Sequence, residues 1–297
     1  MAAEAHHHGP VHLDEEHWQS MAARIELEGE VLLAFVTGAA AWVAELRGPD
    51  VPPVRRIFDI GSGPGVGTCE LAKRFPTAHV TAVDSSPAML GRATQRALSL
   101  GLDGRIAVRL AELPHGLDDM GPADLIWTSM ALHHIGDRVM SLRLLGDLLA
   151  PHGLIAIAER AEPMRVLPVS LDVGRPGLAD RLERAEGEWF REMRAGLTDP
   201  PPSTALGDLL AAAGFEVLGS RLTRERLEAP LSDQARRFVF GHLAHQRRQL
   251  EALLDQDDLQ ALEVLSDADD PRGALHQSKV FLEASRHVVI ARPDRGR

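Results

Sequence analysis

A run of glycines directly follows an apolar segment early in the chain. Residues 57–60 lead into Gly61, Gly63 and Gly65. Glycine is needed where a backbone turns with positive φ, or where a ligand comes closer than a Cβ would permit. A dinucleotide site would need the spacing G-x-G-x-x-G, and no glycine stands at its third place when the count starts from Gly61 or from Gly63. The loop therefore predicts a ligand-binding turn and disfavours a nicotinamide oxidoreductase.

Acidic residues end two apolar segments around this loop. Asp59 precedes the glycines, and Asp84 lies 19 positions after Gly65. At that distance a carboxylate can accept hydrogen bonds from both hydroxyls of a ribose. An acidic residue such as Asp59, at a strand end beneath a loop, is often an anchor that accepts backbone N–H bonds. The two carboxylates predict a nucleoside-binding site.

Alternating strands and helices must position these residues. Apolar runs and helical spacing predict strands over 54–60, 78–83, 105–110, 123–129 and 154–159, with helices over 66–75, 87–100 and 138–150. Such alternation implies a parallel sheet covered by helices on both faces. Further along the chain we expect helices over 177–194, 203–213, 233–254 and 257–265, and strands over 215–222 and 284–291.

The first 50 residues differ from this pattern. Residues 1–16 hold four histidines and few apolar residues, which predicts a flexible arm. Residues 15–46 have apolar residues at helical spacing, and Gly29 is expected to break them into two helices.

The segment from Asp59 to Gly65 matches the pattern D/E-x-G-x-G-x-G and resembles the cofactor loop of class I S-adenosylmethionine-dependent methyltransferases. Further sequence motifs of this family follow in the same order over residues 80–90, 110–114, 123–137 and 148–155. The resemblance therefore covers roughly residues 54–222. It implies an α/β fold with a doubly wound, seven-stranded, mostly parallel Rossmann-like sheet whose last strand is antiparallel. A helical cap would come from N-terminal helices and insertions.

This resemblance suggests how the chain is organised. We expect a flexible arm over 1–16, N-terminal cap helices over 17–48, a cofactor-binding core over 54–159, a cap insertion over 160–203, and the rest of the core over 204–297 with a helical insertion at 231–283. The added segments should gather at the carboxyl ends of the strands, where open α/β sheets bind ligands.

The resemblance also implies roles for individual residues. S-adenosylmethionine would bind and leave as S-adenosylhomocysteine, held by Asp59, Gly61, Gly63, Gly65, Asp84, Ser85, Met89, Glu112, Leu113 and Ser129. Asp59 would contact the amino group of the cofactor as an alternative to its role as an anchor. Met89 would contact the adenine, and Glu112, where Asp is more usual, would accept from the adenine amino group. His133 and His134 would lie beside the transferred methyl, where an imidazole could take a proton from the acceptor, pack, or gate the cofactor. No metal site is expected, because adjacent histidines rarely bind one ion.

The composition limits the kinds of binding partner that the protein can have. The net charge of -11, from 43 acidic and 32 basic residues, disfavours nucleic acid. The single cysteine, Cys69, agrees with a reducing compartment, and no apolar stretch is long enough to span a bilayer. We therefore expect a cytoplasmic protein without membrane contact that binds a small-molecule acceptor, and the sequence leaves a homodimer open.

These observations predict in-line methyl transfer to a small or medium metabolite in an enclosed pocket, with an O, N or C acceptor atom left open. Two alternatives remain, namely a regulatory or partner protein that binds the cofactor without transferase activity, and a methyltransferase that acts on a peptide terminus. Arg160, Arg165 and Arg175 could clamp a carboxylate. Arginine replaces lysine almost throughout this chain, however, so each arginine alone carries little information.

Overall fold

The computed structural model describes residues 15–169, 171–195, 197 and 205–295. Most of the predicted arm over 1–16 lies outside these residues, and positions 15 and 16 begin the first helix. The described residues form one seven-stranded sheet of order β3-β2-β1-β4-β5-β7-β6. Its strands are β1 (Arg56–Ile60), β2 (His79–Asp84), β3 (Ile106–Leu110), β4 (Ala123–Ser129), β5 (Leu149–Arg160), β6 (Phe215–Leu227) and β7 (Leu282–Pro293).

The strand directions confirm the predicted doubly wound, mostly parallel sheet. Strands β1 to β5 pair in parallel, and β7 lies antiparallel between β5 and β6. The register places Arg160 at the end of β5 directly opposite Arg286 of β7. Because parallel strands end at one edge, the residues after β1, β2, β4 and β5 meet along the same side of the sheet.

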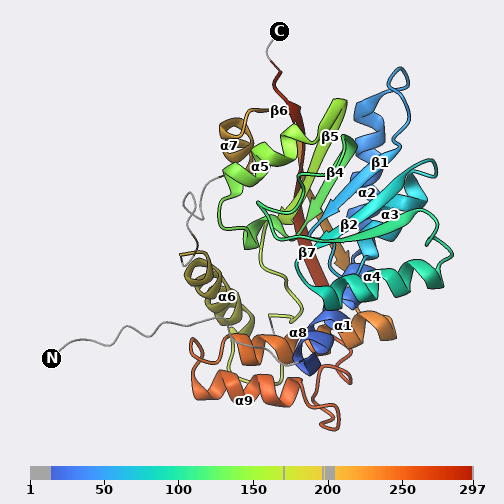
Figure 1. Ribbon diagram of the computed structural model, residues 1–297. Helices are drawn as coiled ribbons and strands as arrows, with labels where there is room; N and C mark the ends of the chain where they lie inside the picture. The colour runs from blue at the N-terminus through green and yellow to red at the C-terminus, as the bar shows by residue number, and fades with distance from the viewer. Residues whose placement is uncertain (1–14, 170, 196, 198–204, 296–297) are drawn as a thin grey trace.

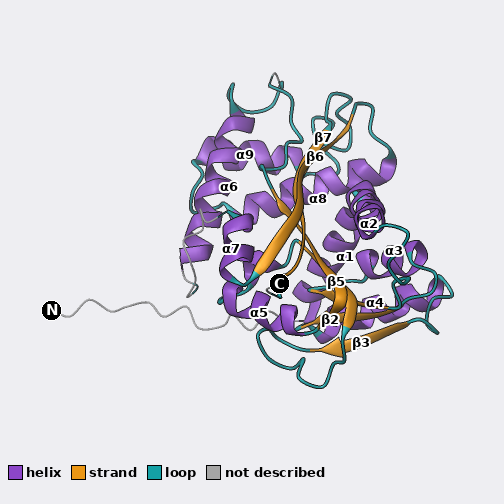
Figure 2. Ribbon diagram, turned by 90° about the horizontal axis from the view of Figure 1, so that it is seen from above, coloured by secondary structure: helices purple, strands orange, loops and turns teal. Residues whose placement is uncertain are grey.

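Helices cover both faces of this sheet (Figure 2). Buried residues of α2 (Leu33–Arg47) and α3 (Val66–Arg74) pack on one face, and those of α5 (Arg138–Asp147) and α7 (Leu206–Ala212) pack on the other. Helix α4 (Pro87–Ser99) packs on β2 and β3 beside α3. A short 3-10 helix, η1 (Leu132–His134), follows β4. These two apolar layers pack against both faces of the sheet and so stabilise the positions of the strand ends.

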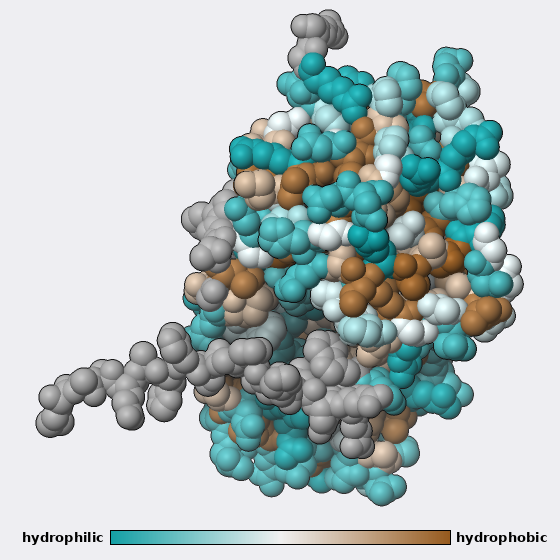
Figure 3. Space-filling view, in the orientation of Figure 1, coloured by the Kyte–Doolittle hydropathy of each residue, from teal (hydrophilic) through white to brown (hydrophobic). Residues whose placement is uncertain are grey.

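A helical cap covers that edge. It contains α1 (Glu15–Val31), α6 (Leu178–Ala195), α8 (Asp233–Gln249) and α9 (Gln256–Leu265), which Figure 1 shows gathered at one end of the sheet. The cap has its own apolar cluster, which includes Leu182, Phe238 and Leu262. Figure 3 shows that on the visible face apolar surface gathers over the sheet half, whereas the cap end is mostly hydrophilic. The cap helices are far apart in the sequence and meet only at this end of the sheet.

The break between the first two helices differs from the expectation. Gly29 lies inside α1, and the chain bends by 60° at Leu32, between α1 and α2. A Cβ at Gly29 would lie 3.0 Å from the Cβ of Val66, so this glycine lets α1 pack closely on the start of α3. Its role is contact between helices rather than helix breaking. Within the described residues, no single helix has the length and apolar content that crossing a membrane requires, and the α1–α2 pair meets such a test only when joined across its bend.

Several predicted boundaries shift. Strand β5 starts at Leu149, five residues earlier than expected, because the turn after α5 pairs with Ala123 across an irregular register. Helix α8 ends at Gln249, before the predicted end at 254, and β6 extends to Leu227 along β7.

Candidate active site

The glycine loop joins β1 to α3 with three left-handed backbone conformations. Gly61, Gly63 and Gly65 have φ of 68°, 53° and 80°. A Cβ on Gly61 would lie 2.2 Å from the Cβ of Ala131, and one on Gly65 would lie 2.7 Å from the Cβ of Ala93. Both the conformation and the close neighbours therefore require glycine at these two positions.

Asp84 is fixed at the end of β2 beside this loop. Its Oδ2 accepts the N–H of Gly63 at 2.9 Å, and its Oδ1 accepts the N–H of Ser86 at 2.9 Å. The Ser86 hydroxyl in turn caps α4 by accepting the N–H of Met89 at 3.4 Å. Each carboxylate oxygen accepts two hydrogen bonds, so Asp84 keeps capacity for two further donors, such as the hydroxyls of a ribose.

Asp59 lies deeper, with 2 % of its surface exposed. Its Oδ2 accepts the hydroxyl of Thr68 at 2.5 Å. Burial, assisted by the negative charge of Asp84 and opposed by the Thr68 hydrogen bond, raises the pKa of Asp59 to about 7. This bond from the Thr68 side chain links β1 to α3, whereas no backbone N–H bond to the Asp59 carboxyl occurs among the described residues. A contact between Asp59 and a cofactor stays a prediction.

The other predicted cofactor residues border the same edge. The N–H of Ala111 donates to the carbonyl of Asp84 at 3.1 Å, which brings Glu112 and Leu113 close to the end of β2. Glu112 is exposed, whereas Leu113 packs against the core, and Met89 is buried on α4. Ser85 is exposed directly after Asp84, and Ser129 ends β4 opposite Ala158.

The loop also fits a bound nucleoside cofactor by a separate criterion. Among the described residues, the hydroxyls of Ser62, in the glycine loop, and Thr128, near the end of β4, are buried without a hydrogen-bond partner. Buried polar atoms normally find partners. A ligand bound at the glycine loop could supply the hydrogen bonds that these two hydroxyls lack.

His133 is paired with a carboxylate that the sequence analysis did not single out. Glu159, at the end of β5, lies 2.6 Å from the Nδ1 of His133 through its Oε2. Its Oε1 accepts the N–H of Leu132 at 2.9 Å and that of Ala131 at 3.2 Å. Burial alone would raise the pKa of Glu159, but the His133 hydrogen bond and charge and the two N–H donors lower it below its ordinary value. An ionised Glu159 therefore holds η1 and one ring nitrogen of His133.

His134 behaves differently from its neighbour. Its ring centroid is 4.1 Å from that of His133. Desolvation, followed by the charge of His133, lowers the pKa of His134 to about 4, although part of this residue reaches solvent. Both causes favour the neutral ring, so His134 is uncharged at pH 7. Of the predicted pair, His133 has the geometry of an oriented acid–base group.

The cap contacts His133, whereas His134 is exposed. The ring of Phe190 on α6 lies 5.8 Å from that of His133, and Nη1 of the buried Arg194 donates to the carbonyl of His133 at 2.6 Å. Helix α1 contacts the glycine loop, because a Cβ at Gly63 would lie 3.7 Å from Ile25. These contacts place two cap helices beside the predicted site.

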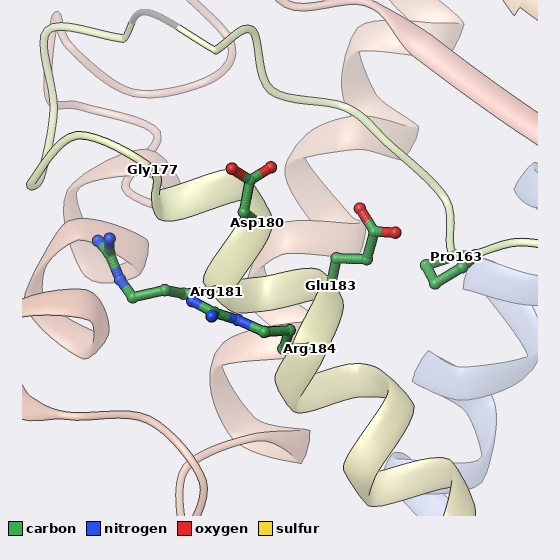
Figure 4. A pocket seen from close by; sticks show the side chains of 6 residues that line it. All are labelled: Pro163, Gly177, Asp180, Arg181, Glu183 and Arg184. Atoms are coloured by element: carbon green, nitrogen blue, oxygen red, sulfur yellow. The ribbon is translucent and has the colours of Figure 1, made fainter.

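A surface depression lies elsewhere on the cap. It is lined by Pro163, Gly177, Asp180, Arg181, Glu183 and Arg184 along the first turns of α6 (Figure 4). The side chain of Arg181 binds Asp258 of α9 at 2.6 Å, so it joins two cap helices. The depression contains none of the predicted site residues and is distinct from the carboxyl edge.

Comparison with known proteins gives the site its context. A family model described as a methyltransferase domain matches residues 57–153. A trans-aconitate 2-methyltransferase from Methylobacterium radiotolerans is 34% identical over 174 residues, 55% of this chain and 58% of that protein. The chain thus spans little more than half the length of that relative. An uncharacterized methyltransferase from Mycobacterium bovis is 32% identical over 154 residues, 50% of this chain and 71% of that protein.

A solved structure shows the same fold. An O-methyltransferase family protein from Burkholderia thailandensis has a TM-score of 0.50 at 18% identity, covering 70% of this chain and 57% of that one. The matched family model spans β1 to β5, including the glycine loop, Asp84 and His133. The chain also matches most of the length of the M. bovis methyltransferase. Together, these two matches show that the chain belongs to the class I S-adenosylmethionine-dependent methyltransferases.

Proposed function

We propose that this protein transfers a methyl group from S-adenosylmethionine to a small metabolite held between the carboxyl edge of the sheet and the helical cap. The observation that carries the proposal is the position of Asp84. Two backbone N–H groups hold its carboxylate at the head of the glycine loop, with two acceptor sites left for a ribose.

The cofactor would supply an electrophilic methyl group on a positively charged sulfur. The protein then has to align the acceptor and exclude water, and alignment can contribute up to about 7 to 11 kcal/mol in favourable cases. Asp84 would fix the nucleoside, and the glycine loop would allow its close approach. The buried hydroxyls of Ser62 and Thr128 would bind polar atoms of the cofactor.

His133 would take the proton of an acceptor hydroxyl or amine. Because Glu159 is ionised and acceptor-only, the Nδ1 of His133 donates to it, which leaves Nε2 as the acceptor nitrogen of the neutral ring. Glu159 is then a positioning residue that fixes the tautomer. Phe190 and Arg194 of α6 would keep this pair away from bulk water.

The name of one relative directs the first acceptor trials. The M. radiotolerans protein is named for trans-aconitate, a tricarboxylic acid. Small carboxylic acids, with and without a hydroxyl group, are therefore the first acceptors to offer this protein, with formation of S-adenosylhomocysteine as the readout.

Asp84→Asn tests the proposed function. The substitution replaces one acceptor oxygen with an NH₂ group, so we expect the affinity for S-adenosylhomocysteine to fall roughly ten- to hundredfold, or about 1.5 to 3 kcal/mol. Titration calorimetry measures this directly. Asp103→Asn, on the exposed loop before β3, is the matched control and should bind like the wild type.

Three outcomes separate the alternatives. Unchanged affinity in Asp84→Asn removes Asp84 from the nucleoside site. Absence of any sulfonium or thioether nucleoside binding to the wild type refutes the methyltransferase function. Binding without product from a broad acceptor panel supports the regulatory alternative. Thermal unfolding of both variants shows whether the backbone contacts of Asp84 also stabilise the fold.

A further inference from the structure

Three arginines from distant parts of the chain meet under the cap. Arg160 ends β5, Arg286 lies directly opposite it on β7, and Arg24 comes from α1. We call these three residues the arginine cluster. Arg286 is 4 % exposed, and its guanidinium lies over the ring of Phe35 at 5.2 Å from the centroid. Arg24 and Arg160 are more accessible, with 23% and 34% of their side chains exposed.

Two glutamates pair directly with the cluster. Glu28 of α1 accepts from Arg286 at 3.1 Å and lies 3.6 Å from Arg24. Glu186 of α6 forms an ion pair with Arg160. Three guanidinium groups therefore share two directly paired carboxylates. Among the described residues, Glu159 and Glu225 act on Arg286 through their charges without an ion pair to it.

Helix α8 adds polar atoms that have no partner. Among the described residues, the Nε2 of His242 and the Oε1 of Gln246 are buried and make no hydrogen bond, and each residue is 4 % exposed. Gln246 also reaches Glu186 at 3.5 Å through its Nε2. Burial, and then the positive charges of Arg160 and Arg24, lower the pKa of His242 to about 3. The charges of Arg160 and Arg24 therefore reach His242 on α8.

The cluster lies next to the proposed methyl-transfer site. The order β2-β1-β4-β5-β7 places Asp84, the glycine loop, His133 and Arg160 on successive strands along one edge. With strands about 5 Å apart, β2 to β5 spans roughly 14 Å. Glu159, which reaches His133, and Arg160, which reaches Glu186, are consecutive residues. The charge of Glu159 also acts on Arg286, so the two polar groups are neighbours.

We propose that the arginine cluster binds a carboxylate of the methyl acceptor, and that this anchored carboxylate is separate from the atom that faces His133. The inference rests on the proposed function and names its substrate class, a small metabolite with at least one carboxylate and a second polar group. Guanidinium groups bind carboxylates through paired hydrogen bonds. The unpartnered atoms of His242 and Gln246 supply further polar contacts for the same molecule.

Guanidinium groups also bind phosphate through paired hydrogen bonds. Inorganic phosphate therefore serves as a comparison ligand in the test.

The test measures binding of tricarballylate and malonate to the protein saturated with S-adenosylhomocysteine. We expect both acids to bind, malonamide not to bind, and Arg160→Gln to weaken tricarballylate binding roughly ten- to hundredfold. Arg24→Gln should act in the same direction. Arg292→Gln is the matched control, because Arg292 lies at the far end of the same strand as Arg286, is 54% exposed and pairs with Glu216. Thermal unfolding confirms that each variant is folded.

Measuring the binding of S-adenosylhomocysteine and of the acids separately distinguishes failure of this inference from failure of the proposed function. If S-adenosylhomocysteine binds but neither acid does, the carboxylate site is refuted and the methyltransferase function stands. Equal binding of malonamide, equal binding by Arg160→Gln, or tighter binding of inorganic phosphate than of either acid would each overturn it as well. If the protein binds no S-adenosylhomocysteine, the function itself fails, whatever the acids do.

Discussion

Replacing His133 with asparagine is expected to lower kcat by roughly 10²- to 10⁴-fold, the range in which a positioned acid or base contributes. The affinity for S-adenosylhomocysteine should stay within about twofold, because the nucleoside contacts are those of Asp84 and the glycine loop. Glu159→Gln should also lower kcat, since an amide facing Nδ1 favours the opposite tautomer of His133. Steady-state kinetics on an acceptor that carries an O–H or N–H group measure both effects.

His134→Asn is the control for this prediction. It changes the neighbouring ring, which is neutral at pH 7 and makes no contact with Glu159 among the described hydrogen bonds. Its kcat should therefore stay close to that of the wild type. Full kcat in His133→Asn would show that the acceptor atom arrives already ionised, and His133 would then lose its role as a base.

Asp59→Asn is expected to change how stability depends on pH. The wild-type carboxyl has a pKa of about 7 in the folded protein, against 3.8 as the ordinary value. Between these pH values the folded state holds a proton that the unfolded state has lost, so stability falls as the pH rises through that window and is level above it. The amide that replaces the carboxyl in this variant does not titrate, and its oxygen can still accept from Thr68.

The size of this effect follows from the two pKa values. From pH 5 to pH 8 the wild type should lose roughly 2 to 3 kcal/mol of unfolding free energy relative to Asp59→Asn. Urea unfolding of both proteins at several pH values measures the difference, with the exposed Asp103→Asn as a control that should follow the wild type. Parallel curves for wild type and Asp59→Asn would contradict a raised pKa at this position.

The geometry of the glycine loop and of Asp84 was predictable because its determinants are local. Gly61, Gly65 and Asp84 lie within 24 consecutive positions, and their conformations depend on one strand–turn–helix and the strand beside it. Periodicity and turn chemistry report such short-range relations directly. The seven-stranded, mostly parallel sheet with an antiparallel last strand followed from the resemblance to a family, and the structure confirms it.

The acceptor half depends on relations that periodicity does not report. Arg160 meets Arg286 only because β7 inserts antiparallel beside β5, and Arg286 reaches Glu28 across 258 positions. Considered one at a time, the arginines carried no signal. Glu159 did carry one, since it lies near the end of a predicted strand as Asp59 and Asp84 do, and that shared position could have identified it.

Local spacing also misplaced the first helix break. Gly29 looked like a helix breaker, but its lack of a side chain is needed for contact with Val66. A close approach between helices and a break within one use the same residue type. Only the tertiary contact distinguishes them.

Helix α1 touches both halves of the site at once. Glu26 binds Arg92 of α4 at 2.9 Å, Glu28 binds Arg286, and Glu30 binds Gln234 of α8 at 2.7 Å. The proposed cofactor and acceptor sites therefore share one wall, and a shift of α1 that favours one ligand would change the free energy of binding the other. Such coupling is reciprocal: whatever factor the cofactor applies to the affinity for the acceptor, the acceptor must apply to the affinity for the cofactor.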